Sequence, residues 1–118
     1  MKLMLVGVKY PRAPIEFIEI PHLEGCEEYK KLIRCEVLDY VSHPAIKDVY
    51  ILCDDVGKLV GLSPNFRIPE YRDIIVGTAV FVGVKHGVGE YKESDFCGLS
   101  KKQVKELIAY LNWEDVLI

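Results

Sequence analysis

The sequence lacks the paired cysteines on which zinc knuckles and thioredoxin-type sites depend. Its four cysteines are Cys26, Cys35, Cys53 and Cys97, and no two of them form a C-x-x-C pair. Their even number leaves disulfides open. Because we also expect no signal peptide, for the reason given in the next paragraph, we expect free and mostly buried thiols in a reducing compartment.

The sequence also lacks a hydrophobic run long enough to cross a membrane as a helix. The longest run, Ile74 to Val84, has 11 residues and is interrupted by glycines, whereas a membrane helix needs about 20. The apolar stretch that follows Lys2 is short and is broken by Gly7 and Lys9, which argues against a signal peptide. We therefore expect a soluble protein of the cytoplasm with no membrane partner.

The sequence also lacks an excess of basic residues. The chain carries 15 Lys and Arg against 18 Asp and Glu, for a formal net charge of −3. Binding to duplex DNA draws on basic side chains that displace counterions, so we expect no duplex-DNA partner. The 118 residues suit one domain, and we expect a single domain over residues 1–118.

No catalytic signature stands out. There is no G-x-S-x-G motif, and the three histidines, His22, His43 and His86, are scattered without metal-ligand spacing. The glycine-rich stretch 83–89 lacks the pattern of a phosphate-binding loop and is typical of a hairpin turn. We read Asp54-Asp55 as a solvated turn, the alternative being a divalent-ion site, and Cys97 as a buried thiol. We expect no metal and no cofactor, and an enzyme is disfavoured, although a triad spread over loops stays open.

Alternating and continuous apolar runs predict a sheet. Residues Lys2–Val8 and Ile15–Ile20 are expected to form a hairpin, and Cys35–Val41 and Val49–Cys53 two further strands. The continuous apolar run at 49–53 is typical of a strand buried on both faces. After a turn at 54–57, where Gly57 is free to adopt a positive φ, we expect Lys58–Leu62 to return as a strand.

The second half adds a loop, a long strand and a helix. Residues Ser63–Asp73 have two prolines and no periodicity, which predicts a loop, and Ile74–Val84 is expected to be one long central strand. Residues Leu99–Trp113 form the clearest helix, with a capping box at Ser100 and Gln103 and an apolar stripe at Val104, Leu107, Ile108 and Leu111.

Residues Leu23–Ile33 predict an earlier helix, with acidic residues at its start and lysines at its end. The order hairpin, helix, strands, helix predicts an α+β domain: a mostly antiparallel sheet of five to six strands with two helices. The apolar tail Trp113–Ile118 is expected to pack back on the domain or to meet a second subunit.

Three runs, ILCDDVGKLVGLSPNFR, DIIVGTAVFVG and LSKKQVKELIAYL, are similar to the recurring pattern of a family of small phage and bacterial domains of unknown function, the one numbered 3846. The segment 23–41 fits that family's first helix and strand. Two features depart from the pattern: Arg34-Cys35 stands where relatives have a Gly-Gly turn, and residues 68–72 lengthen the loop before Asp73. The resemblance implies a phage setting and no agreed activity.

The loop 63–73 is the candidate binding site, because binding residues collect on loops carried by a rigid sheet. Its arginines suit a phosphate, its aromatic rings a stacked base, and its amide a base edge. Two further side chains are expected beside it if the flanking strands are neighbours. The candidate residues are Lys58, Asn65, Phe66, Arg67, Tyr71, Arg72 and Thr78. The alternative interpretation is structural: Pro64 and Asn65 set a turn, Phe66 packs, and Arg67 pairs with Asp73.

The resemblance implies a phage-encoded protein that acts in the cytoplasm of a host cell. Together with the candidate loop, it leads to three functional hypotheses. The first is a non-enzymatic protein that sequesters a nucleotide-derived signal of host immunity, with a homodimer or higher oligomer forming the pocket. The second is a protein-interaction module that inhibits a host protein, for which the same loop would be the contact surface. The third, which the sequence supports least, is a nucleotide hydrolase.

Overall fold

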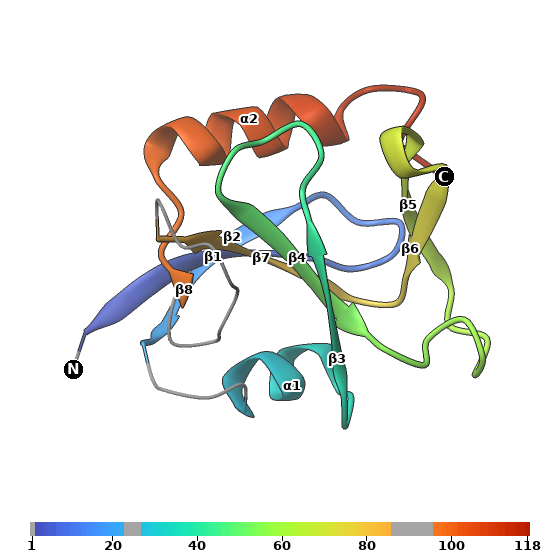
Figure 1. Ribbon diagram of the computed structural model, residues 1–118, viewed down its shortest axis with the longest axis horizontal. Coiled ribbons are helices and arrows are strands. Elements are labelled where there is room, and N and C mark those ends of the chain that lie inside the picture. The colour runs from blue at the N-terminus through green and yellow to red at the C-terminus, as the bar shows by residue number, and fades with distance from the viewer. Residues whose placement is uncertain (1, 23–26, 86–95) are drawn as a thin grey trace.

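The computed structural model describes residues 2–22, 27–85 and 96–118. Its main element is an antiparallel sheet of six strands with the order β2-β1-β7-β4-β3, and β8 pairs with β7 (Figure 1). The strands are β1 (Leu3–Lys9), β2 (Glu16–Pro21), β3 (Leu38–Ser42), β4 (Val49–Asp54), β7 (Ala79–Val84) and β8 (Phe96–Cys97). The predicted α+β class with a mostly antiparallel sheet and two helices is confirmed.

The two helices cover opposite faces of this sheet, α1 (Glu27–Ile33) on one and α2 (Lys101–Leu111) on the other (Figure 1). Side chains of a strand alternate between its faces. In β7, Phe81 therefore packs with Leu107 and Leu111 of α2, whereas Val80 and Val82 join the cluster under α1. Each face thus has its own hydrophobic cluster, which is why β4 and β7 are apolar on both sides.

Several local predictions are confirmed. The hairpin of β1 and β2 runs in register from Leu3 opposite Pro21 to Val8 opposite Glu16. The capping box of α2 is present: the Gln103 backbone N–H donates to Ser100 Oγ, and the Gln103 side chain accepts from the Ser100 backbone. The predicted turn at Gly87 and Gly89 lies outside the described residues.

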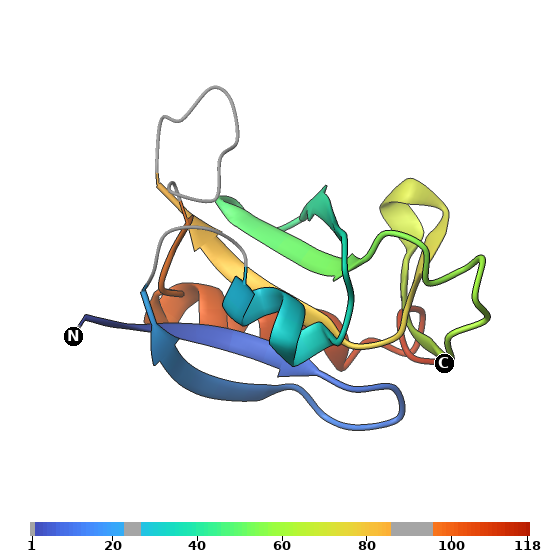
Figure 2. The same cartoon turned by 90° about the horizontal axis from the view of Figure 1, so that it is seen from below.

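The prediction of a loop at 63–73 is wrong. These residues form β5 (Pro64–Ile68), the 3₁₀ turn η1 (Pro69–Tyr71) and the start of β6 (Asp73–Val76), and β5 and β6 pair in a separate two-stranded sheet (Figure 2). Pro64 is tolerated because it is the first residue of its strand. The inward residues Phe66, Ile68 and Ile75 join the core under α2, so tertiary burial overrides the weak strand signal.

The predicted long strand 74–84 is two strands. Gly77 separates β6 from β7 with a φ of +73°, a left-handed conformation that glycine adopts without steric cost. Its N–H donates to the Ser63 carbonyl, which turns the chain from the small sheet into the large one. The expected return strand at 58–62 is also wrong: this segment forms successive turns, and Gly61 rather than Gly57 has the positive φ.

The tail after α2 packs back on the domain. Val116 is buried, its carbonyl accepts the Arg67 backbone N–H at 2.7 Å, and Leu117 forms an isolated bridge with Phe66. Ile108, which the sequence places on the buried stripe of α2, is instead 42% exposed. Among the described residues, no helix is long and apolar enough to cross a membrane.

Candidate functional site

The structure disperses the seven residues predicted for a binding loop. Phe66 lies in the core and stacks on Phe81 with ring centroids 5.6 Å apart. Its ring therefore has no exposed face for a base, which corrects its predicted stacking role. Asn65 is also buried, and its Nδ2 donates to the backbone carbonyls of Lys9 and Gly77, both at 2.8 Å. Its amide donors are thus used within the protein rather than offered to a base edge.

The exposed members of the set have local roles or none. Lys58 forms a salt bridge with Asp73, so the acid predicted to pair with Arg67 pairs with a lysine instead. This lysine's hydrogen bond holds the pKa of the Asp73 carboxyl below its ordinary value. The Tyr71 hydroxyl donates to the Ser42 carbonyl at 2.7 Å, which ties η1 to the end of β3.

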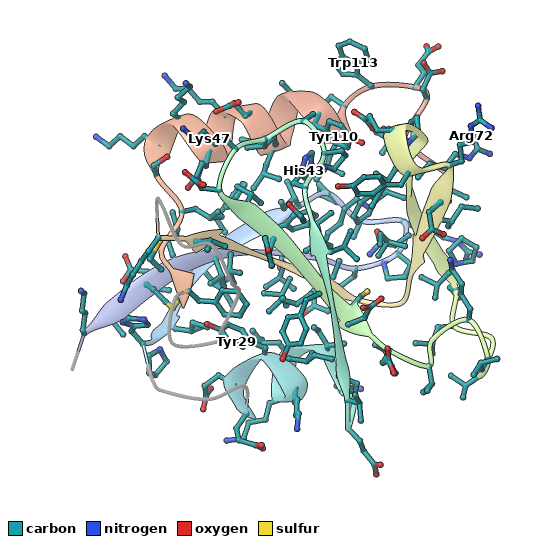
Figure 3. The ribbon with its side chains drawn as sticks, in the orientation of Figure 1. Tyr29, His43, Lys47, Arg72, Tyr110 and Trp113 are labelled. Atoms are coloured by element: carbon teal, nitrogen blue, oxygen red, sulfur yellow. The ribbon has the colours of Figure 1, made fainter. Side chains whose placement is uncertain are left out.

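The two arginines do point outward. Arg67 and Arg72 are exposed, and within the described residues neither forms a salt bridge. Figure 3 shows Arg72 at the outer end of the small sheet, directed away from the core. Its φ of 52° places it in the left-handed region at the end of η1. Thr78 is half-buried between β6 and β7. Neither arginine, nor Thr78, lines any of the cavities described below.

A cleft that the sequence did not indicate lies around Lys9, at the end of β1. Lys9 is 3% exposed, although lysine is rarely buried without a carboxylate partner. Its Nζ donates to Asn65 Oδ1 at 2.7 Å and lies 3.5 Å from the Tyr10 carbonyl. Nζ also stands 5.9 Å from the centre of the Phe66 ring. Every one of these partners is electrically neutral.

The electrostatics of the site follow from that burial. Desolvation lowers the pKa of the Lys9 ammonium, because the charged form loses water without gaining an opposite charge. An ammonium has three N–H donors, and two acceptors are in place, the second at a long distance. At least one donor therefore remains for a further acceptor.

The cleft has a volume of about 510 Å³, which falls within the range of small-molecule sites. Arg12 adds a second cation, and among the residues that the structure describes no aspartate or glutamate lines the cleft. Arg12 adopts a φ of 63° in the turn between β1 and β2. The remaining walls come from that turn, from β5, from α2 and from the tail: Ala13, Pro14, Ile15, Asn65, Ile108, Leu111, Asn112, Leu117 and Ile118.

One signal in the sequence points to Lys9. Strand alternation in LMLVGVK places Lys9 in phase with Leu5 and Gly7, on the face that packs toward α2. A lysine in phase with inward positions is a candidate for burial. Its partner Asn65 lies 56 residues away, and no pattern in the sequence connects the two.

A second hollow, of about 260 Å³, lies between η1 and the segment after α2. It is lined by Ala45, Pro69, Glu70, Tyr110, Trp113, Asp115 and Val116. In Figure 3 Tyr110 lies beside His43, and Trp113 follows the end of α2. In the described part of the chain, no group of three or more histidine, cysteine, aspartate or glutamate side chains is placed to hold a metal ion.

Comparison with known proteins gives a family and no function. Neither a curated protein nor a solved structure significantly matches the chain. Residues 1–112 match a protein family described as Domain of unknown function (DUF3846). This match covers both helices and the strands that hold the Lys9 cleft, and it agrees with the resemblance in the three sequence runs. The chain therefore belongs to the DUF3846 family.

Proposed function

We propose that this protein binds a small organic anion in the Lys9 cleft and does not transform it. The observation that carries the proposal is the Lys9 ammonium, which is buried, lines the cleft and, within the described residues, has only neutral hydrogen-bond partners. A nucleotide-derived signalling molecule, the ligand class expected from the sequence, combines such an anion with a ring. The binding role that the sequence predicts for residues 63–73 is thus assigned in this proposal to the Lys9 cleft, which Asn65 also lines.

The energetics favour an anionic ligand. A buried charge without a counter-ion is costly, and an opposite charge at hydrogen-bond distance offsets that cost where water is excluded. A bound phosphate or carboxylate would accept the remaining Lys9 N–H and face Arg12 at the rim. Binding would also raise the pKa of Lys9 toward its ordinary value, because an adjacent anion favours the ammonium.

The walls of the cleft favour an apolar portion in the same ligand. Ile108, Leu117 and Ile118 are between 42% and 52% exposed, and all three line the cleft. Burial of this surface under a ring would contribute roughly 25 cal/mol for each Å² removed from water. Inorganic phosphate, which offers the charge alone, should therefore bind much more weakly than a nucleotide.

Thermal-shift and calorimetric titrations test this function. The ligands are ADP-ribose, cyclic dinucleotides, a nucleoside monophosphate and inorganic phosphate. The Lys9→Met variant removes the charge in the cleft, whereas Lys105→Met removes the same charge from an exposed position of α2. We expect saturable binding of at least one nucleotide-type ligand, loss of binding in Lys9→Met, and retention in Lys105→Met. The absence of binding to every ligand, or equal binding by both variants, contradicts the proposal.

A second candidate function is that of a protein-interaction module. One observation favours it: Leu59 is 87% exposed and Val60 62% exposed in the same turn, beside exposed Val56. Adjacent exposed apolar side chains are typical of contact surfaces. In this case a Leu59→Asp, Val60→Asp double variant should lose a stoichiometric protein partner that Lys9→Met retains. Native mass spectrometry of the purified chain would separate a host protein from a second copy of the same chain.

A further inference from the structure

We infer that the hollow between η1 and the tail binds the cationic head group of an organic ligand, a quaternary ammonium or an alkylguanidinium. The hollow is separate from the Lys9 cleft in its lining residues. Its chemistry is the opposite one: of the described residues, two aromatic side chains and two carboxylates line it, and no lysine or arginine does.

The aromatic walls come from the last turn of α2 and from the segment that follows it. Trp113, the only tryptophan of the chain, is 66% exposed, which is unusual for so large a side chain. Tyr110 lies three residues earlier, within α2, and is partly buried. The faces of tryptophan and tyrosine rings attract cations through their quadrupoles, and indole is the strongest of the natural rings.

The charge of the hollow adds to this attraction. Glu70 comes from η1 and Asp115 from the tail, and neither forms a salt bridge within the described part of the chain. One oxygen of Glu70 accepts the Tyr110 hydroxyl at 2.7 Å, which leaves its second oxygen available. The hollow also lies at the C-terminal end of α2, where the helix dipole places partial negative charge.

A contact with His43 helps to hold the Tyr110 ring in place. His43 packs against it edge to face, with ring centroids 4.5 Å apart. His43 Nδ1 accepts the backbone N–H groups of Ala45 and Ile46, both at 3.1 Å, so the neutral ring carries its proton on Nε2. Burial lowers the pKa of His43 to about 4, although Glu70 opposes this shift. At neutral pH His43 is therefore uncharged and does not act as a resident cation beside Glu70.

The size of the hollow selects a head group rather than a whole nucleotide. Its volume of about 260 Å³ lies below the usual range of volumes for pockets that enclose a complete small-molecule ligand. A trimethylammonium or guanidinium group has a compact, weakly hydrated cation that fits such a space. The same chemistry occurs in a free quaternary amine and in an arginine side chain of another protein.

Trp113 fluorescence provides the test, since no other tryptophan contributes to the signal. The probes are choline, its neutral isostere 3,3-dimethyl-1-butanol, and N-acetylarginine amide. We expect a saturable change with at least one of the two cations and none with the neutral isostere. A response to choline identifies the site as one for free quaternary amines, and a response confined to the arginine derivative identifies a side-chain site. Equal responses to choline and to the isostere overturn the inference, as does the absence of any response.

Matched variants locate the effect. A double variant, Glu70→Gln with Asp115→Asn, keeps the shapes of both side chains and should weaken cation binding about tenfold. Glu114→Gln removes the same type of charge from an exposed neighbour that does not line the hollow, and its binding should match that of the unmodified chain. Lys9→Met should also bind the cation normally, which distinguishes this site from the anion cleft. Far-UV circular dichroism verifies that each variant folds, and equal affinity in the double variant and in Glu114→Gln contradicts the assignment.

Discussion

Lys9 and Asn65 hydrogen-bond to each other twice. The lysine Nζ donates to Asn65 Oδ1 at 2.7 Å, and Asn65 Nδ2 donates back to the Lys9 carbonyl at 2.8 Å. The reciprocal pair joins the end of β1 to β5 across 56 residues. A third hydrogen bond, from the Asn65 amide to the Gly77 carbonyl, extends the network to the break between β6 and β7. One buried side chain therefore holds both the cation of the cleft and the junction of the two sheets.

Replacement of Asn65 by alanine should destabilise the fold by about 2.5–6 kcal/mol. The change removes the best acceptor of a buried ammonium, a bond worth about 1.5–3 kcal/mol, and two hydrogen bonds from the amide to backbone carbonyls, each worth about 0.5–1.5 kcal/mol. Urea unfolding followed by circular dichroism measures the effect. Asn112→Ala is the control, because Asn112 is exposed and its loss should cost no more than about 0.5 kcal/mol. Similar losses in both variants would show that the Asn65 network adds little to stability.

The pH dependence of stability should report His43. Its pKa is lowered to about 4 by burial, while the unfolded chain retains an ordinary histidine pKa of about 6.5. Because the folded value is the lower one, the unfolded state binds the proton more tightly. Stability is therefore retained above pH 6.5 and falls between pH 6.5 and 4, by about 3 kcal/mol in total.

The His43→Asn variant isolates this contribution. An asparagine oxygen can accept backbone N–H groups two and three residues ahead, as His43 Nδ1 does, but it does not titrate. We expect its unfolding free energy to change less than that of the unmodified chain between pH 7 and 4.5. If the two curves stay parallel over that interval, other groups cause the acid sensitivity.

Gly77 and Gly61 form a matched pair for testing the break between β6 and β7. Both have a positive φ, of 73° and 75°. A Cβ at Gly77 would lie 2.7 Å from Leu62 Cδ1, whereas a Cβ at Gly61 would have nothing within 4 Å. Gly61→Ala should cost about 1 kcal/mol, for the left-handed backbone alone.

Gly77→Ala should lower the free energy of unfolding by more than Gly61→Ala does. Its backbone is left-handed too, and in addition the Leu62 side chain must move to make room for the new Cβ. Thermal or urea denaturation of the two variants, measured under one condition, gives the difference. Equal losses would mean that Leu62 moves away without cost.

The arginines of the small sheet provide a test of where the anion binds. Arg67 and Arg72 are exposed and form no salt bridge among the described residues, so Arg67→Ala and Arg72→Ala should change stability by less than about 0.5 kcal/mol. If the anion occupies the Lys9 cleft, both variants should bind it with unchanged affinity in a calorimetric titration. A loss as large as that of Lys9→Met would return the site to the face of β5 and β6.

The candidate site shows what residue types can predict before the fold is known. Arginine, asparagine and aromatic side chains in one proline-containing segment suggested an anion site at 63–73. In the structure, strand alternation sends Phe66 inward and Arg67 outward, so the segment divides its residues between the core and the solvent. Asn65 retains a place beside a cleft, but as the partner of a lysine that the sequence placed just after the first strand of the hairpin.

The sequence by itself determined the hairpin of β1 and β2, the doubly buried strand at 49–53 and the capping box of α2, because each depends on residues that are close in the chain. Only the tertiary structure decided that residues 63–76 form a second small sheet, that Gly77 ends it, and that Lys9 is buried against Asn65. The physical reason is that burial depends on which distant segments pack together. The free-energy cost of burying the Lys9 charge and the free energy gained when β5 forms both depend on residues that are distant in the sequence.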